Sequence, residues 1–202
     1  MKPYSESSEQ NKTVILEVLR QQFSECEKIL EVGSGTGQHA VYFASALAHL
    51  QWFCSDISEN LNGISAWIKE AGLDNITGPI ELDVNRTVWD VLPVDGVFSA
   101  NTVHIMSWPS VENMFAGISR CLNSQGIFCL YGPFNYNGGF TSESNARFDQ
   151  WLKARDAVSG VRDFEALNTL AAKHDMTLLE DYEMPENNRI LVWQKARVID
   201  LV

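Results

Sequence analysis

Apolar and polar positions follow two different periods along the chain. Residues 6–23 place Val14, Ile15, Val18, Leu19 and Phe23 at helical spacing, which predicts an N-terminal helix. From residue 28 onward, short apolar runs of strand length take turns with helical patterns. The predicted strands are 28–32, 52–56, 79–84, 95–101 and 126–134, and the predicted helices between and after them are 38–50, 61–71, 110–122 and 164–174. This alternation is typical of an α/β domain built on a parallel sheet.

The end of the chain breaks the alternation. Two further strands, 176–184 and 189–195, are separated only by "PENN". Such a connection is too short for a crossover between parallel strands, so the last strand must run antiparallel to its neighbour. The expected fold is therefore α/β and Rossmann-like, with a seven-stranded, mostly parallel sheet, an antiparallel C-terminal strand and helices on both faces.

The length of 202 residues suits one domain. We expect residues 1–202 to form it, with an N-terminal helical segment (1–27), a ligand-binding core (28–133), and a C-terminal helix and hairpin (164–202). The connection 134–163 is long enough to act as a lid over a site.

Composition and charge exclude several classes of function. The formal net charge of -11, without a basic cluster, opposes the phosphate backbone, so we expect no nucleic-acid partner. No apolar run approaches the roughly 20 residues that span a bilayer, and "MKPYSESSEQNK" lacks the apolar core of a secretory signal, so we expect a cytoplasmic protein without a membrane partner. The four cysteines form no C-x-x-C pair, which favours reduced core thiols and no metal site.

The most informative stretch is "ILEVGSGTGQHA", in which Gly33, Gly35 and Gly37 separate a predicted strand from a predicted helix. Glycine there allows positive φ and close approach of a ligand, and the helix N-terminus offers free N–H groups. The loop therefore predicts a site for a small, partly anionic ligand. A structural turn without a ligand is the alternative.

The spacing of the glycines restricts the kinds of ligand that the loop can bind. The dinucleotide fingerprint needs a small residue at position 38, which is Gln38, so NAD is disfavoured but stays open. A phosphate-binding P-loop needs a Lys-Ser or Lys-Thr pair after the glycines, and "GQHA" contains none, which excludes ATP by that route.

Residues 29–195 resemble the class I S-adenosylmethionine-dependent methyltransferases, in the glycine loop, the acids that end two strands and the terminal hairpin. The resemblance implies that Asp56 binds both ribose hydroxyls of S-adenosylmethionine, that Asp83 accepts from the adenine amino group, and that Ile57 and Val84 sandwich the adenine. It implies that the methionine end of the cofactor is wrapped by Glu31, Gly33, Ser34, Gly35, Thr36 and Gly37.

A narrower resemblance covers nearly the whole chain. "KPYSESSEQNK", "ILEVGSGTGQHA", "NTVHIMSW" and "MPENN" are similar to the small methyltransferase-like family that includes animal methyltransferase-like protein 26. This likeness names no substrate.

The reacting end should lie where the fourth strand ends, at "ANTVHIMSWP". Asn101 is expected at the cofactor, and His104 is the candidate catalytic base because an unperturbed imidazole titrates near neutral pH. A structural histidine is the alternative. The stretch lacks the two prolines found in adenine and cytosine N-methyltransferases, which disfavours a nucleobase acceptor.

The acceptor itself is not fixed by these motifs. Residues expected to contact it come from the N-terminus, from the segment after the fourth strand and from the connection 134–163: Tyr4, Asn11, Trp108, Tyr136 and Arg155. Arg155 and Arg162 favour a small molecule that carries a carboxylate over a polymer. We interpret the chain as an S-adenosylmethionine-dependent methyltransferase for a small acceptor. A non-catalytic S-adenosylmethionine-binding protein and an NAD-dependent oxidoreductase remain alternatives, and the oligomeric state is undetermined.

Overall fold

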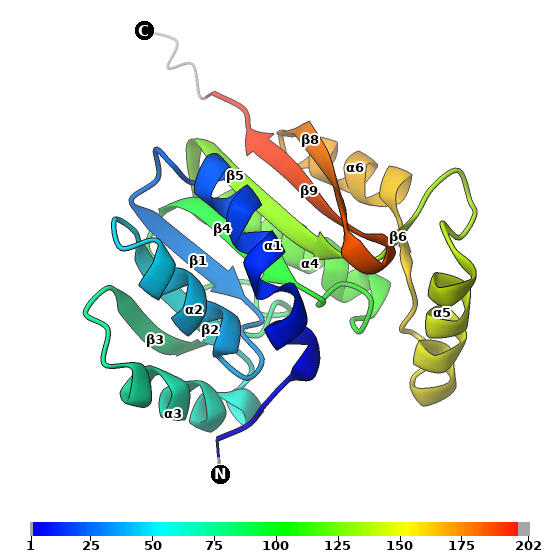
Figure 1. The fold of residues 1–202 in the computed structure, drawn as a ribbon. Coiled ribbons are helices and arrows are strands. Elements are labelled where there is room, and N and C mark those ends of the chain that lie inside the picture. The colour runs from blue at the N-terminus through cyan, green and yellow to red at the C-terminus, as the bar shows by residue number, and fades with distance from the viewer. Residues whose placement is uncertain (1, 198–202) are drawn as a thin grey trace, which may run out of the picture.

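The computed structural model describes residues 2–197, so Met1 and residues 198–202 of the expected domain lie outside the described residues. Its main sheet has seven strands in the order β3-β2-β1-β4-β5-β9-β8 (Figure 1). The strands are β1 (Lys28–Val32), β2 (Gln51–Asp56), β3 (Ile76–Glu81), β4 (Val94–Ala100), β5 (Leu122–Gly132), β8 (Met176–Met184) and β9 (Asn188–Lys195). Two short strands, β6 (Phe134–Asn135) and β7 (Arg162–Asp163), pair separately in parallel.

The strand directions confirm the predicted fold class. β1 to β5 pair in parallel, whereas β9 runs antiparallel to both β5 and β8. The turn between β8 and β9 is a short 3-10 segment, Pro185–Asn187, and its residues Glu186 and Asn187 both have φ of 58°. Met184 pairs with Asn188, so three residues form the turn, and the two left-handed residues among them help to reverse the chain between the antiparallel strands.

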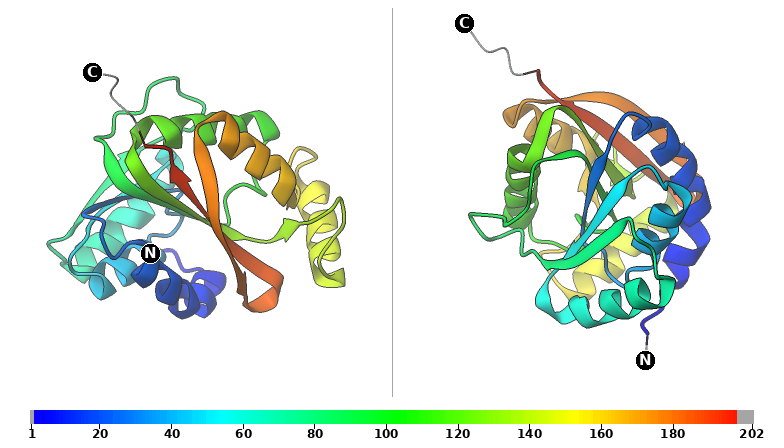
Figure 2. Two further views of the ribbon diagram at one scale, coloured as in Figure 1. Left: turned by 90° about the horizontal axis from the view of Figure 1, so that it is seen from above. Right: turned by 90° about the vertical axis from the view of Figure 1, so that its left-hand side faces the viewer.

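Helices cover both faces of the sheet (Figure 2). One face carries α1 (Glu6–Gln22), α2 (Gln38–Ala46) and α3 (Leu61–Ala71), which pack in an apolar cluster with Phe43 and Trp52. The other face carries α4 (Trp108–Cys121) and α6 (Phe164–Lys173), packed around Phe115 and Trp193. β1 and β9 lie inside the sheet and are buried over much of their length, which explains the apolar runs in their sequences.

The largest differences from the predicted boundaries lie in three elements, and the other boundaries differ by two residues or fewer. β3 begins at Ile76 and ends at Glu81, three residues earlier than expected at each end, because Gly78 and Pro79 lie inside it. Proline lacks an N–H donor, but β3 is an edge strand and tolerates that loss. The predicted helix 38–50 ends at Ala46, and the predicted strand 126–134 begins at Leu122, directly after α4.

One helix lies outside the two layers. α5 (Glu143–Arg155) belongs to the connection between β6 and β7 and stands at the side of the molecule, away from the other helices (Figure 1). Ser142 caps its N-terminus by accepting from the Asn145 N–H. Across residues 2–197, no helix combines the length and the apolar character needed to cross a membrane.

Candidate functional site

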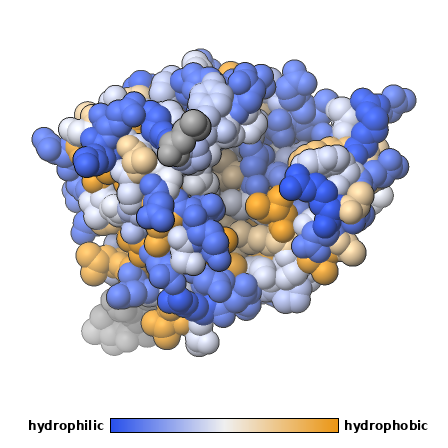
Figure 3. All heavy atoms as spheres, turned by 90° about the horizontal axis from the view of Figure 1, so that it is seen from below, coloured by the Kyte–Doolittle hydropathy of each residue, from blue (hydrophilic) through white to orange (hydrophobic). Residues whose placement is uncertain are grey.

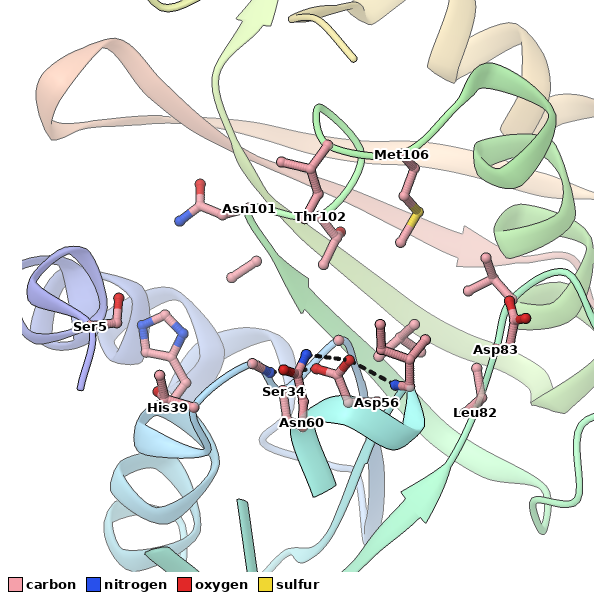
Figure 4. A pocket seen from close by; sticks show the side chains of 18 of the residues that line it. Ser5, Ser34, His39, Asp56, Asn60, Leu82, Asp83, Asn101, Thr102 and Met106 are labelled. Atoms are coloured by element: carbon pink, nitrogen blue, oxygen red, sulfur yellow. Dashed lines mark hydrogen bonds between the residues drawn. The ribbon is translucent and has the colours of Figure 1, made fainter. Parts of the chain in front are cut away.

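A cavity of about 460 Å³, called the first cavity below, lies at the carboxyl ends of β1 to β4. The strand order reverses between β1 and β4, and open α/β sheets bind ligands at this position. Its wall combines the loops that follow these four strands with Ser5, Ser7 and Ser8 of the N-terminal segment, and Figure 4 shows several of the lining side chains around the opening. The cavity is within the size range of about 300–1,000 Å³ usual for small-molecule sites.

The glycine loop forms one side of this cavity, and its glycines have different roles. A Cβ on Gly33 (φ +77°) would lie 2.6 Å from Cγ2 of Thr102, so this glycine is required by packing. A Cβ on Gly35 (φ +58°) would meet no atom of the described chain within 4 Å, although Gly35 lines the cavity. Gly35 therefore exposes bare backbone to the space that a ligand would fill.

Asp56, at the end of β2, lies beside the glycine loop and is 7 % exposed. Its Oδ1 accepts from the Ile57 N–H (2.7 Å) and from Asn60 Nδ2 (2.9 Å), and its Oδ2 accepts from the Gly35 N–H (2.6 Å) (Figure 4). A carboxylate oxygen has two lone pairs, so Oδ2 retains capacity for one more donor. The carboxylate thus orients the loop and still offers an acceptor to a ligand.

Asp83 lies on the opposite side of the cavity, two residues beyond the end of β3 (Figure 4). Its Oδ1 accepts from the N–H and the Nδ2 of Asn85, at 2.9 and 3.1 Å, which leaves Oδ2 without a donor among residues 2–197. Val84 and Ile57 also line the cavity, and Ile57 is 45 % exposed. Together they present a carboxylate oxygen and apolar surface to the same space.

Glu31 does not line the cavity. Its Oε2 accepts from Ser34 Oγ (2.9 Å) and from Trp52 Nε1 (3.1 Å), and the side chain is 2 % exposed. Burial raises the pKa of Glu31 from 4.5 to about 7, against the lowering effect of these two donors. Glu31 connects the glycine loop to β2 through Ser34 and Trp52. Ser34 and Thr36 line the cavity itself, and Gly37 is the N-cap residue that precedes α2.

The N-terminal segment closes over the cavity through contacts that sequence reasoning missed. Gln38 accepts from the Ser5 N–H (2.5 Å) and donates to the Ser5 carbonyl (3.3 Å). The indole of Trp67 donates to the Pro3 carbonyl at 2.8 Å. Position 38, which argued against a dinucleotide fingerprint, therefore holds the segment that carries Ser7 and Ser8 to the cavity.

The second cavity, of about 320 Å³, adjoins the first through Ser7 and Asn101, which line both. It lies between α1, the end of β5, α5 and the turn of the β8–β9 hairpin. Figure 3 shows the molecule hollowed beside α5, with apolar side chains around the hollow. Asn11 lines this second cavity and its Oδ1 lies 2.7 Å from Nε2 of His39, which lines the first. A polar contact therefore connects the two cavities.

His104 lies in the loop after β4, where it was expected, but it lines neither cavity. It is 5 % exposed, its ring packs edge-on against Phe148 of α5 at 5.2 Å, and its Nδ1 has no hydrogen-bond partner in the described part of the chain. Burial, with Arg162 as a smaller cause, lowers the pKa of His104 to about 4. Near neutral pH the imidazole is therefore uncharged.

Of the five residues expected to contact the acceptor, only Asn11 lines the second cavity. Tyr4 is 60 % exposed at the surface, and Trp108 lines a separate depression beside α6. The Tyr136 hydroxyl donates to Asp181 (2.8 Å), and the Arg155 guanidinium stacks on Trp151 (4.5 Å). Intramolecular partners thus hold Tyr136 and Arg155, which local sequence does not reveal.

Solved structures share this fold over most of the chain. An O-methyltransferase family protein from Burkholderia thailandensis superposes with a TM-score of 0.82 at 9% identity, covering 93% of this chain and 57% of that one. An O-methyltransferase family 2 protein from Planctomyces limnophilus, in complex with apigenin, gives 0.81 at 14% identity, with 92% and 56% covered. The S-adenosylmethionine-dependent methyltransferase SibL, in its apo form, gives 0.79 at 18% identity, with 94% and 56% covered.

These similarities establish a Rossmann-like methyltransferase fold, and the chain spans just over half the length of the structures it matches. At the level of sequence, one family model matches residues 2–195, and its description is "Protein of unknown function (DUF938)". The protein therefore belongs to the DUF938 family.

Proposed function

We propose that the protein is an S-adenosylmethionine-dependent methyltransferase that acts on a small-molecule acceptor. The observation that carries the proposal is the first cavity, where the glycine loop, Asp56 and Asp83 converge from three strand ends. The second cavity, joined to the first at Asn101, provides a separate place for an acceptor.

The groups around the first cavity fit the cofactor. The open acceptor position on Asp56 Oδ2 suits one ribose hydroxyl. Oδ1 already accepts from two donors, so a hydrogen bond to the second hydroxyl would require loss of the bond from the Ile57 N–H or from Asn60. The free Oδ2 of Asp83 suits the adenine amino group, with Ile57 and Val84 as apolar contacts. The bare backbone at Gly35 leaves room for the methionine end.

When bound, the cofactor supplies a methyl group on a positively charged sulfur, so that the acceptor–methyl bond forms as the carbon–sulfur bond breaks and its electron pair stays on sulfur. The protein must align the acceptor and receive its proton. We propose Asn101 as the group that positions the two ligands, since it lines both cavities.

We propose His104 as the base. Its neutral imidazole has an unpartnered Nδ1, and a buried polar atom without a partner is uncommon outside functional sites. A Cβ added to Gly132 would lie 3.8 Å from His104 Nδ1 and 3.9 Å from Asn101 Oδ1, so both side chains lie beside Gly132 at the end of β5. Phe148 contacts the His104 ring and lines the second cavity, and we propose that a shift of Phe148 gives the acceptor access to Nδ1.

The similar structures support a small acceptor, because two belong to O-methyltransferase families and one holds apigenin. The four motifs that resemble the methyltransferase-like protein 26 family support kinship with it. We further propose that the chain acts as one domain in the cytoplasm and, with its net charge of -11, without nucleic acid.

A screen for methyl transfer tests the proposed activity. Purified protein and S-adenosylmethionine labelled in its methyl group are incubated with a fractionated metabolite extract, and Asp56→Ala serves as the control. Label transfer that requires protein and falls in the variant is expected. Binding of the cofactor without transfer to any fraction would favour the non-catalytic alternative, and tight binding of NAD in its place would favour the oxidoreductase.

A further inference from the structure

The second cavity is lined by groups that accept hydrogen bonds. Among the described residues that line it, Glu186 is the one with a formal charge, and no lysine, arginine or histidine is present. The carboxylate belongs to the hairpin turn, and the ion pairs formed within residues 2–197 do not include it. Glu186 is exposed to solvent and also lines a neighbouring depression together with Arg189, whose guanidinium is paired with Asp181 and Glu183. A ligand in the second cavity therefore meets one negative charge from its lining.

Two amides increase the acceptor character. Asn145 uses both amide hydrogens within the protein, donating to Thr141 Oγ1 (2.9 Å) and to the Asn187 carbonyl (3.2 Å). Nδ2 of Asn188 donates to the Pro185 carbonyl (3.2 Å). Because both amide hydrogens of Asn145 and one of Asn188 are engaged in this way, the carbonyl oxygens of these amides are available to a ligand.

Aromatic rings complete the lining. Tyr131, which is 3 % exposed, lies at the end of β5, and Phe148 reaches the cavity from α5. Aromatic faces attract cations through the ring quadrupole. A carboxylate, amide oxygens and aromatic rings around one space are the chemistry that recognises a protonated amine.

The arginines of the segments around the second cavity have partners within the protein, and Arg147 of α5 pairs with Glu143 (3.8 Å). Arg189 follows the hairpin turn but pairs with Asp181 (2.8 Å) and Glu183 (3.0 Å). Arg162 donates to the main-chain carbonyls of Val103 (3.0 Å) and Val158 (2.9 Å), and Arg155 stacks on Trp151. The sequence-based expectation that Arg155 and Arg162 would receive a carboxylate on the acceptor is therefore not supported by their positions.

We propose that the methyl acceptor carries a protonated amine, and that Glu186, Asn145 and Asn188 hold this group in the second cavity, apart from the atom that is methylated. The inference rests on the proposed function, because it takes the second cavity as the acceptor site.

Binding of three matched probes tests the inference without knowledge of the natural acceptor. Phenethylamine, 2-phenylethanol and 3-phenylpropionate carry a positive, a neutral and a negative group on similar frames. Each is titrated by ligand-observed NMR into protein saturated with S-adenosylhomocysteine. The variants are Glu186→Gln and, as a matched control with the same change of charge, Glu180→Gln, an exposed residue of β8 that lines none of the cavities described above.

The wild type should bind the amine about tenfold more tightly than the alcohol, and the carboxylate most weakly, because only the amine combines a hydrogen bond to Glu186 with an attraction between opposite charges. Glu186→Gln should remove that preference, and Glu180→Gln should retain it. Equal binding of the three probes, absence of amine binding, or equal effects of both variants would overturn the inference. Affinity for S-adenosylhomocysteine separates the two failures: its absence refutes the proposed function, whereas its presence without an amine preference refutes only this inference.

Discussion

Glu31 makes the stability of the protein depend on pH in a direction unusual for a carboxylate. Its folded pKa of about 7 lies above its ordinary 4.5, so the native state binds more protons than the unfolded state between these values. The stability that it contributes is present below pH 4.5 and is lost as pH rises through about 7. With about 1.4 kcal/mol for each pH unit of difference, ionised Glu31 costs the native state about 3 kcal/mol.

Glu31→Gln removes this charge and keeps the shape. We expect the free energy of unfolding of the wild type, minus that of the variant, to fall by about 2 to 3 kcal/mol between pH 5 and pH 8. Urea unfolding followed by circular dichroism at several pH values measures both quantities. The pKa values of His39 and His104, each lowered to about 4 by burial, have the opposite effect, with stability lost as pH falls from 6.5 toward 4. Both proteins share these histidines, so the difference isolates Glu31.

The control is Glu17→Gln, on the exposed side of α1, where the carboxylate remains in water in both states. The corresponding difference for Glu17 should stay nearly constant with pH. A constant difference for Glu31 as well would refute the reasoning, because it would mean that Ser34 and Trp52 fully compensate for the burial of the carboxylate.

Three further predictions follow from the site. The Gly35→Ala variant should fold with a loss of about 1 kcal/mol of stability, because of its positive φ, and should bind S-adenosylmethionine more weakly. The Gly33→Ala variant, whose new Cβ clashes with Thr102, should have a much lower melting temperature, and equal effects of the two variants on melting and binding would contradict these separate roles. If His104 is the base, turnover should rise as the pH rises through about 4. His104→Gln should lower turnover by ~10² to 10⁴ and leave cofactor affinity nearly unchanged. If turnover of the variant still falls at low pH as in the wild type, the base is another residue. Duplex DNA and RNA should show no gel shift at low micromolar protein and physiological salt, and retardation that fades with salt would reveal a basic face.

Local patterns predicted the order of strands and helices because each element is encoded by its own periodicity. The antiparallel last strand followed from the length of one turn. The first cavity was predictable for a related reason: Gly33, Asp56 and Asp83 lie at or just beyond the ends of parallel strands, and the carboxyl ends of such strands meet at one edge of the sheet.

The contacts of Glu31 could be predicted only in part from the sequence. Along β1 the side chains alternate between faces, and Glu31 shares the face of Ile29, which packs with Trp52. The period of two could have placed Glu31 beneath the loop, but its partnership with Trp52 depends on the register of β2.

The second cavity was not predictable from the sequence. It combines α1, α5 and a turn near residue 186, and no local signal relates segments so far apart. The "MPENN" stretch contributes only a family resemblance at the level of sequence, and its role in carrying Glu186 to the cavity arises in the folded chain. The partners of long side chains such as Arg155 could not be predicted from the sequence either, because they depend on the tertiary structure.

Calorimetric titration with S-adenosylhomocysteine tests the central claim most directly, because it needs no acceptor. We expect binding at micromolar concentration, about -8 kcal/mol, and a weakening of roughly 1.5 to 3 kcal/mol in Asp56→Ala, since a charged acceptor of hydrogen bonds is lost. Thermal melting of the variant without ligand confirms that it is folded. Absence of binding by the wild type, or an unchanged affinity in a folded Asp56→Ala, would contradict the assignment of the first cavity to the cofactor.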